Sequence, residues 1–456
     1  MNLIVIMLDS LRRDYLGCYG NTWIKTPNID KFAKESILFE EAYTEGLPTI
    51  PARTELFTGC SSLSYRPWQP LTKEDVTISE ILGDYDYTSA LIADTYHLFK
   101  PDMNFHRAFS CFRWIRGQEA DAYVSGPLNK NINDYIKSAM KGDPVEGMLE
   151  QYLKNTEHRQ KEEDYFAAQV FKEAAKWLER NKSEEKIFLW VDSFDPHEPW
   201  DPPSPFDKMY TDPNYKGPKL IHPKYGKVDW MSEEELKYVR ALYAGEVSFV
   251  DKWVGYLLEK IKDCSLYDNS LIVFIADHGH PHGDHGSIMK TPDNLYSELI
   301  KIPLLFHPPE GPYAGERIDA LIQMPDILPT ILEIMDLKKE TQAMSGKSFW
   351  PVVEGEKEKI RDYIVTGYHE SYHRCIRDKE WSLIVHPEGE ENELYNLKED
   401  PRETKNLINK YPEKAEGLLS YLGRYSSLKA KELNRTLSQK TKILQLQYEL
   451  SHTSVR

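Results

Sequence analysis

The amino-acid sequence predicts a layered α/β domain built on a parallel sheet. Four short apolar runs lack the polar alternation of a half-exposed strand, and polar or turn residues bound each of them. They are residues 3–8, 89–93, 187–191 and 271–276. Helical patterns lie between these runs, for example over 164–181 and 233–262. Buried strands that alternate with helices are typical of a sheet covered by helices.

An aspartate directly follows each of the four predicted strands; these residues are Asp9, Asp94, Asp192 and Asp277. Ligands of open α/β sheets bind beyond the carboxyl ends of the strands, and parallel strands bring these ends to one edge. An aspartate in this position can also cap the following helix, and we expect one or two of the four to be caps. The others are predicted to form an acidic site.

The segment GLPTIPARTELFTG, residues 46–59, predicts a short helix that Pro51 opens and Gly59 closes. A helix start carries unpaired N–H groups and a partial positive charge, which suits an anion. Thr49 is therefore either an ordinary N-cap or a residue placed to meet an anion.

The segment IADHGHPHGDHGSIMK, residues 275–290, is the densest group of functional side chains. Its candidates are Asp277, His278, His280, His282, Asp284, His285 and Lys290. Aspartate and histidine together suit a divalent ion, and the first pair, nearest the strand, is best positioned. In the proline-rich segment 191–203, His197 is either an acid or anion-binding group or a structural loop histidine.

Composition narrows the range of partners. The chain has 456 residues, 40% hydrophobic residues and a formal net charge of −16, which argues against nucleic acid or an anionic membrane as the main partner. Five scattered cysteines predict reduced thiols. We found no signal peptide and no apolar run of the roughly 18 residues that span a bilayer, so we expect a cytoplasmic protein.

Changes in sequence character divide the chain into three parts. Residues 1–360 are predicted to form the main α/β domain. Residues 361–410, with strand-like pieces at 363–366 and 381–385, predict a small antiparallel sheet. Residues 411–456 predict a helical tail, which either contacts another copy in a homo-oligomer or is a loose terminus.

Over residues 2–410 the chain resembles the sulfatase branch of the alkaline phosphatase superfamily. The motifs are NLIVIMLDSLRRDYLGCYG, KTPNIDKFAKESILFEEAY, TIPARTELFTG, FDPHEPW, ADHG followed by GDHG and Lys290, IKIPLLF, MPDILPTILEIM, SGKSFWPVVEGE and ELYNLKEDPRETKNL. The resemblance implies a mixed, largely parallel central sheet sandwiched by helices, with a small C-terminal antiparallel sheet. It also implies a metal-dependent hydrolase of small anionic esters.

The resemblance assigns roles residue by residue. Thr49 takes the nucleophile position, and Arg53 steadies it. Asp9, Thr49, Asp277 and His278 form the metal set, which is similar to that of single-metal phosphonate monoester hydrolases and phosphodiesterases. This implies one divalent ion: Mn²⁺, Zn²⁺, Fe²⁺, Mg²⁺ or Ca²⁺. The groups that contact the transferred group are His197 and Lys290, and His97 is a histidine near the nucleophile.

One departure from the family decides the expected chemistry. The family signature has a cysteine, oxidised to formylglycine, where this chain has Thr49. Threonine has one hydroxyl, so its covalent intermediate must be resolved by water at the central atom, a step that phosphorus tolerates. We therefore expect hydrolysis of phosphodiesters or phosphonate monoesters, with His197 or His97 protonating the leaving oxygen. The alternatives are a sulfatase without formylglycine and a non-catalytic or transferase descendant.

The segment between 114 and 155 lies between core elements. It is either a substrate wall, with Arg116 reaching an anion, or a surface insertion.

Overall fold

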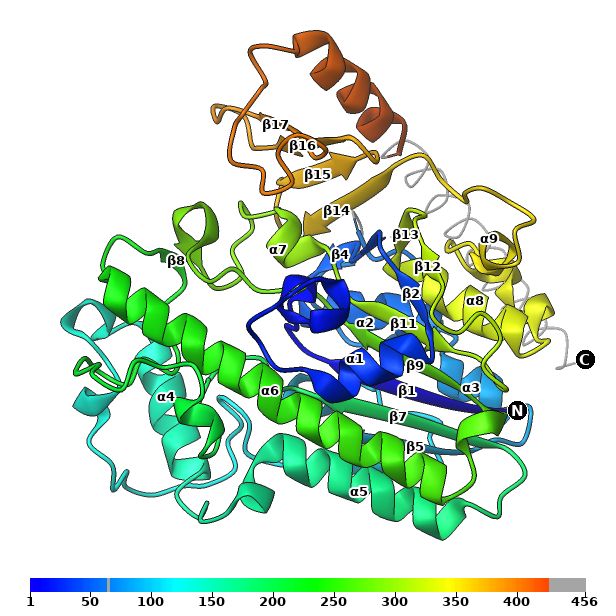
Figure 1. The fold of residues 1–456 in the computed structure, drawn as a ribbon, viewed down its shortest axis with the longest axis horizontal. Coiled ribbons are helices and arrows are strands. Elements are labelled where there is room, and N and C mark those ends of the chain that lie inside the picture. Colours follow the sequence, from blue (N-terminus) through cyan, green and yellow to red (C-terminus); the bar gives the residue numbers. More distant parts are fainter. Residues whose placement is uncertain (64–65, 426–456) are drawn as a thin grey trace, which may run out of the picture.

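The computed structural model describes residues 1–63 and 66–425. Its centre is an eight-stranded sheet (Figure 1) in the order β12-β2-β11-β9-β1-β7-β5-β6. Neighbouring strands are parallel except for β11, which is antiparallel to both of its neighbours. In sheet order the strands are Arg317–Ile318, Ile37–Phe39, Leu304–His307, Ser270–Ala276, Asn2–Leu8, Ile187–Ser193, Thr88–Ala93 and Cys111–Trp114. The predicted largely parallel sheet is confirmed.

The central strands are apolar without alternation because both of their faces are buried. In β1, the side chains of Ile4, Ile6 and Leu8 join one core, and those of Leu3, Val5 and Met7 join the other. Successive side chains point to opposite faces of a strand, so a sheet covered on both faces needs apolar residues at every position.

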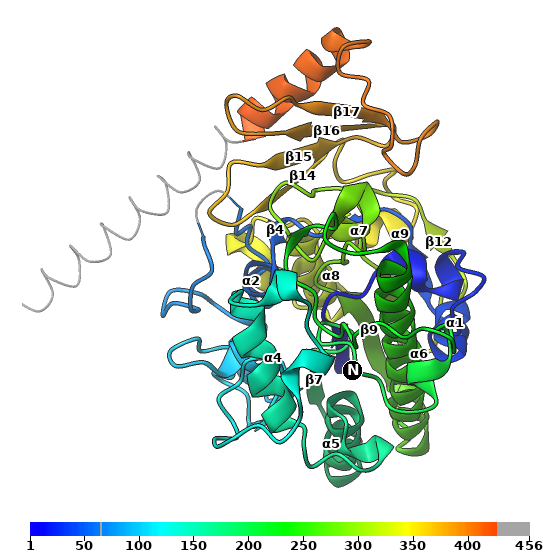
Figure 2. The same ribbon diagram turned by 90° about the vertical axis from the view of Figure 1, so that its left-hand side faces the viewer.

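Helices cover both faces of the sheet (Figure 2). One layer holds α1 (Pro27–Lys34), α4 (Pro144–Asn155), α5 (Phe166–Asn181) and α6 (Glu233–Asp263). The other layer holds α2 (Thr49–Thr58), α3 (Ile78–Gly83), α8 (Ile327–Ile334) and α9 (Trp350–Val353). The predicted helices over 164–181 and 233–262 correspond to α5 and α6.

A second, five-stranded sheet lies at the C-terminal end, at the top of Figure 1. Its order is β17-β16-β15-β14-β4, with strands Glu393–Asn396, Trp381–Val385, Arg374–Arg377, Ile364–Tyr368 and Gly46–Leu47. The first four strands are antiparallel, as predicted, but β4 comes from the segment just before α2 and pairs in parallel with β14. The small sheet is thereby fixed to the main domain beside the start of α2.

Residues 412–425 are helical and pack on this sheet through Ala415 and Leu418. Residues 426–456, where contact with another copy is predicted, lie outside the described residues.

Two short strand pairs and one short α-helix complete the described strands and α-helices outside the two main sheets and their helices. β3 (Ala42–Tyr43) pairs with β13 (Ile322–Gln323), β8 (Gly226–Lys227) pairs with β10 (Ser287–Ile288), and α7 spans Ser297–Ile300.

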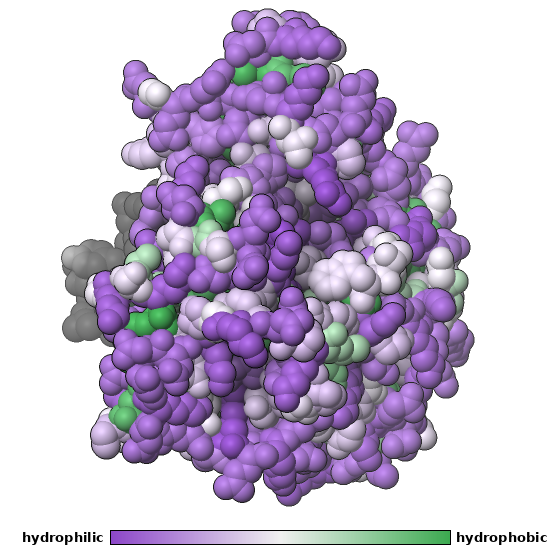
Figure 3. Space-filling view, turned by 60° about the vertical axis from the view of Figure 1, so that its left-hand side comes forward, coloured by the Kyte–Doolittle hydropathy of each residue, from purple (hydrophilic) through white to green (hydrophobic). Residues whose placement is uncertain are grey.

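All five cysteines are free, as predicted. None of the helices in the described part of the chain combines the length and the apolarity that crossing a bilayer requires. On the face drawn in Figure 3, apolar side chains form small groups scattered over a largely hydrophilic surface.

Candidate active site

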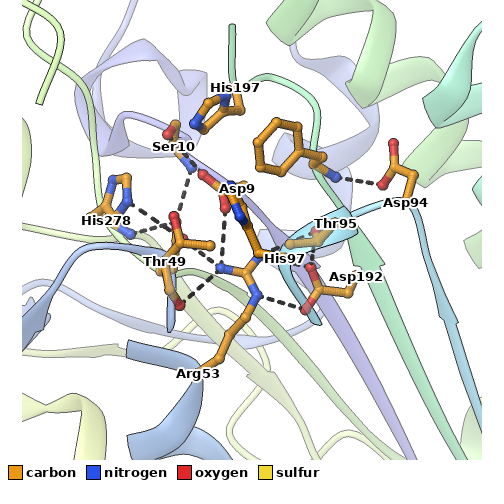
Figure 4. Close-up of polar contacts among 12 residues, drawn as sticks. Asp9, Ser10, Thr49, Arg53, Asp94, Thr95, His97, Asp192, His197 and His278 are labelled. Atoms are coloured by element: carbon orange, nitrogen blue, oxygen red, sulfur yellow. Dashed lines mark hydrogen bonds and ion pairs between the residues drawn. The ribbon is translucent and has the colours of Figure 1, made fainter. Parts of the chain in front are cut away.

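Three of the four strand-end aspartates converge on one arginine at the carboxyl edge of the sheet (Figure 4). Arg53 bonds to Asp192 through Nε (3.0 Å) and Nη2 (2.7 Å). Its Nη1 lies 2.7 Å from Asp277 Oδ2 and 3.1 Å from Asp9 Oδ2. All four side chains are fully buried. The parallel register of β9, β1 and β7 therefore brings together carboxylates that are far apart in the sequence.

The fourth aspartate has a different environment. Asp94 accepts hydrogen bonds from the backbone N–H of Phe194 (2.7 Å) and from Gln118 Nε2 (2.9 Å). The helical turns that follow β1, β5 and β9 have other residues at their N-cap positions. The turn that follows β7 begins after Pro205. The expectation that one or two of the four aspartates are N-caps is therefore wrong; three of the carboxylates meet Arg53 in α2, and that of Asp94 meets Gln118 and the backbone of Phe194.

The local charge balance favours a divalent cation. Three carboxylates against one guanidinium leave a formal charge of −2 in a fully buried site. Burial and the neighbouring Asp277 raise the pKa of Asp9 well above its ordinary value, although Arg53 opposes this. A buried pair of carboxylates is costly to ionise fully unless an added cation compensates the charge.

The donor atoms fit such an ion. Asp9, Asp277 and His278 offer ligand atoms that all lie within 4.8 Å of one another. Because His278 Nδ1 lies 2.8 Å from the carbonyl of Gly279 and donates to it, the lone pair is on Nε2. His278 Nε2 is buried without a hydrogen-bond partner, and Asp9 Oδ2 is buried with no hydrogen bond beyond its ion pair with Arg53. Such orphaned atoms need an explanation in a native structure, and a shared cation supplies one.

Ser10 shapes this cluster without joining the donor set. Its backbone has a positive φ of 60°, which few residues other than glycine adopt. In that conformation its N–H donates to Asp277 Oδ1 (2.9 Å) and its hydroxyl donates to Asp9 Oδ1 (2.8 Å). These bonds fix both carboxylates and leave their second oxygens facing Arg53.

Thr49 lies at the start of α2, beside this cluster (Figure 4). The helix begins at Thr49 itself, the cap position is Pro48, and no side chain caps the helix, so the N-cap alternative for Thr49 is wrong. Gly59 ends the helix in the left-handed conformation, as predicted. The Thr49 carbonyl accepts a bond from Arg53 (3.2 Å), whereas its hydroxyl makes no hydrogen bond to any described residue. An unengaged hydroxyl therefore sits where a helix N-terminus meets the acidic cluster.

Lys290 and His197 form a second group next to the first. Lys290 Nζ lies 2.9 Å from His197 Nε2 and bonds to both oxygens of Glu198 (2.9 and 3.0 Å). His197 Nδ1 donates to the Glu198 carbonyl (2.7 Å), so its Nε2 carries the lone pair. Burial lowers the pKa of His197 well below its ordinary value. Neutral His197 therefore accepts a hydrogen bond from the lysine ammonium.

Glu198 is a site residue that the sequence analysis missed. It is fully buried and accepts a bond from Tyr225 (2.7 Å) in addition to those from Lys290. Burial alone would raise its pKa, but the positive charge of Lys290 holds it well below the ordinary value. The only signal in the sequence was its position directly after His197. Glu198 is therefore the counter-ion that holds the Lys290 ammonium in position.

His97 lies near this group, whereas Arg116 does not. His97 packs edge-on to Trp68, and its Nε2 is 3.8 Å from Glu119. Arg116 forms two 2.7 Å bonds to Asp121 and stacks on Trp114. Its guanidinium is therefore occupied by an internal carboxylate and is not aimed at the cluster.

The later residues of the histidine-rich loop serve the structure around the site. His280 Nε2 lies 3.1 Å from Glu198 Oε2, and Asp284 accepts a bond from Arg12 (2.6 Å). His282 packs against Tyr243, and His285 stacks on Tyr296. Within this loop, the donor set that meets Asp9 is thus limited to Asp277 and His278.

The buried carboxyl group of Glu298 makes the free energy of unfolding depend on pH. Burial, followed by the charge of Asp284, raises the pKa of Glu298 to about 8. The unfolded chain ionises this group at its ordinary lower pKa, so native stability falls between that value and about pH 8. We expect Glu298→Gln to gain stability over the wild type by up to about 1.4 kcal/mol per pH unit in this window. Unfolding free energies of both proteins from urea titrations between pH 5 and 8 measure the difference; a constant difference would contradict it.

Comparisons with known proteins give matches over most of the chain. The Sulfatase family matches residues 1–337, and the family "N-sulphoglucosamine sulphohydrolase, C-terminal" matches residues 283–422. An arylsulfatase of Clostridium perfringens is 27% identical, with 90% of each chain covered. The multifunctional alkaline phosphatase superfamily protein PehA of Trinickia caryophylli is 24% identical, with 96% of each chain covered.

Among solved structures, the phosphonate monoester hydrolase of Agrobacterium radiobacter superposes with a TM-score of 0.73. It is 20% identical in sequence, and the match covers 94% of this chain and 96% of that one. This likeness supports the fold.

Proposed function

The chain belongs to the sulfatase family. Because Thr49 stands at the nucleophile position, we propose that the protein hydrolyses phosphodiesters or phosphonate monoesters with Thr49 as the nucleophile. It is an ester hydrolase of the alkaline phosphatase superfamily, whose members depend on divalent metal. The observation that carries the proposal is the unengaged hydroxyl of Thr49 beside the buried donors Asp9, Asp277 and His278.

Threonine favours phosphorus over sulfur as the centre of attack. The Thr49 hydroxyl gives its proton to solvent and its oxygen bonds to phosphorus, while the bond to the leaving oxygen breaks and that oxygen takes a proton from the His197–Lys290 pair. Water must then attack the same phosphorus to release Thr49, because a single hydroxyl provides no second route for expelling the group. A sulfo-enzyme would need the corresponding attack at sulfur.

A divalent ion held by Asp9, Asp277 and His278 would favour ionisation of a nearby hydroxyl and offset negative charge on the transferred group. The chain adds its own positive charge through Lys290 and the N-terminus of α2. Arg53 acts differently, because its donors are already used by three carboxylates and the Thr49 carbonyl. We propose that Arg53 is a positioning residue that holds Asp9, Asp277 and Thr49 together.

We assign protonation of the leaving oxygen to the His197–Lys290 pair. His197 is neutral, and the lone pair on its Nε2 accepts the hydrogen bond from the lysine ammonium. The departing alkoxide therefore takes its proton from Lys290 Nζ, which His197 holds in position. Glu198 and Tyr225 keep the pair in place. His97 is the second candidate, because its Nδ1 is buried without a partner.

Sulfate ester hydrolysis is the second candidate function. It is favoured by the name of the Clostridium perfringens relative, an arylsulfatase. Sulfate and phosphate esters have similar shapes, so a site for one can accept the other. Retention of the complete acidic cluster, Thr49 and Lys290 argues against a non-catalytic or transferase descendant.

A substrate panel separates these functions. We expect bis(p-nitrophenyl) phosphate and p-nitrophenyl phenylphosphonate to be hydrolysed faster than p-nitrophenyl phosphate or p-nitrophenyl sulfate. EDTA should abolish turnover, and added Mn²⁺ or Zn²⁺ should restore it, because without a cation nothing at Asp9, Asp277 and His278 favours ionisation of the nucleophile. Release of p-nitrophenol, measured by absorbance, gives kcat/KM for each ester. A preference for the sulfate ester would favour the second candidate, and turnover that survives complete metal removal would contradict the proposed site.

A further inference from the structure

Two loops meet at one end of the C-terminal sheet. Strands β15 and β16 are antiparallel, and Arg374 pairs with Val385 at the end of their ladder. His373 precedes Arg374 and His386 follows Val385, so the two imidazoles flank this last pair from opposite strands. Their ring centroids are 5.2 Å apart at an interplanar angle of 82°.

The hydrogen bonds of each imidazole leave one ring nitrogen free, and the two free nitrogens face the same region. His386 Nε2 lies 3.1 Å from Glu393 Oε1 and donates to it, which leaves the lone pair on Nδ1. Glu393 also accepts bonds from the hydroxyls of Tyr296 and Tyr395 and is therefore ionised. His373 Nδ1 lies 2.8 Å from Ser371 Oγ, a hydroxyl that can donate or accept. In the tautomer whose Nδ1 donates to this hydroxyl, the lone pair is on Nε2. His386 Nδ1 and His373 Nε2 are both buried without a hydrogen-bond partner.

A carboxylate faces the same space. Glu390 Oε2 lies 3.8 Å from His373 Nε2 and 3.9 Å from His386 Nδ1, too far for a hydrogen bond to either. The ligand atoms of the three residues lie within 4.8 Å of one another. The side chains of His373 and His386 are only 13% and 6% exposed. Asp293 adds a further negative charge that acts on both imidazoles. Lone pairs and negative charge that face one another are unfavourable unless a cation lies between them.

We propose that His373, His386 and Glu390 bind a transition-metal dication of the Zn²⁺ class at a site separate from the active site. Two imidazoles and one carboxylate suit Zn²⁺, Ni²⁺ or Co²⁺ and disfavour Mg²⁺ and Ca²⁺, which prefer oxygen ligands throughout. The bond from His386 to Glu393 is the carboxylate–histidine arrangement that commonly orients metal-binding imidazoles.

The position of the site indicates what the metal would do. Three protein ligands leave one coordination position for water or another small ligand. His386 and Glu390 also line a cavity of about 330 Å³, which borders Asp293 and Asn294 in the segment shortly after Lys290. A bound ion would join the loop before β15 to the loop between β16 and β17. The site therefore stabilises the small sheet on the side that faces the Lys290 segment.

Metal titration of the full chain, stripped with a chelator, tests the proposal without relying on activity. We expect isothermal titration with ZnCl₂ to show two sites per chain in the wild type and one in His278→Ala, which lacks an active-site ligand. The double variant His278→Ala/His386→Ala should bind none. Loading His278→Ala with Co²⁺ should give the visible absorption of a site with imidazole ligands, and His386→Ala should remove that signal.

Two further variants keep the test decisive. Glu390 is 58% exposed, so Glu390→Gln should fold normally. Placed in the His278→Ala background, it should weaken zinc binding at least about 10-fold, since even outer-shell changes cost that much. The matched control is His158→Ala, which removes an exposed histidine outside the cluster. Unchanged zinc affinity in both Glu390→Gln and His386→Ala, or an equal loss in His158→Ala, would overturn the site.

Discussion

Thr49→Ala is expected to lower kcat at least about 1,000-fold on the best phosphodiester or phosphonate substrate, with a much smaller change in KM. Alanine removes the only oxygen that can form the covalent bond, while Asp9, Asp277, His278 and Lys290 stay in place. Steady-state kinetics on metal-loaded protein measure the effect, and the metal content of the variant must match that of the wild type.

Two substitutions at the same position serve as controls. Thr49→Ser keeps the hydroxyl and should keep most of the activity. Thr49→Cys restores the family signature in the string Cys-x-Pro-Ala-Arg, and in a host that oxidises this cysteine it should raise sulfate ester hydrolysis relative to phosphodiester hydrolysis. If Thr49→Ala retained most of its metal-dependent turnover, the nucleophile would have to be another group. The preference for phosphorus over sulfur, which rests on the single hydroxyl of Thr49, would then have no basis.

Arg53→Met is expected to cost about 3–5 kcal/mol of folding stability, the penalty for leaving buried charge unpaired. Arg53 is fully buried, and its five-donor fork is shared among Asp9, Asp192, Asp277 and the Thr49 carbonyl. Methionine fills most of the volume but pairs with none of these groups. Urea unfolding of the metal-free proteins measures the loss.

The double variant Arg53→Met/Asp192→Asn identifies the cause. Asp192 accepts two bonds from Arg53, one from Thr95 (2.6 Å) and one from the Trp190 indole (3.3 Å), and it is not one of the metal donors. Neutralising it should restore part of the lost stability, whereas added Mn²⁺ or Zn²⁺ should restore another part through Asp9 and Asp277. A double variant no more stable than Arg53→Met would show that packing, and not unpaired charge, dominates the loss.

Local sequence patterns were sufficient to predict most of the fold. Strands β1, β5, β7 and β9 are continuous apolar runs because both of their faces are covered, and this requirement acts on every residue of a strand. Proline and glycine marked the ends of α2, although the helix starts two residues before Pro51. The pairing of Asp277 with His278 was predictable because the two residues are adjacent in the sequence.

The resemblance supplied what spacing could not. Local pattern made Thr49, His197 and Lys290 candidates with open alternatives, and their match to family motifs gave each of them a specific expected role. The structure brings them together with Asp9 and Asp277, but it turns Arg116 toward Asp121. Glu198 was not assigned to the site, and Asp192 was only one of four strand-end candidates, since their partners are distant in sequence: Lys290 for the first, and Arg53 for the second.

The sequence by itself determined the layered α/β class, the buried parallel strands and the position of an acidic edge, because those properties follow from periodicity and from residues next to one another. Only the tertiary structure decided that Asp192 would bind Arg53 while Asp94 would bind Gln118, that β4 would join the C-terminal sheet, and that His373 would face His386. Each of these outcomes depends on strand order and register between distant segments, and no local preference of the chain encodes that pairing.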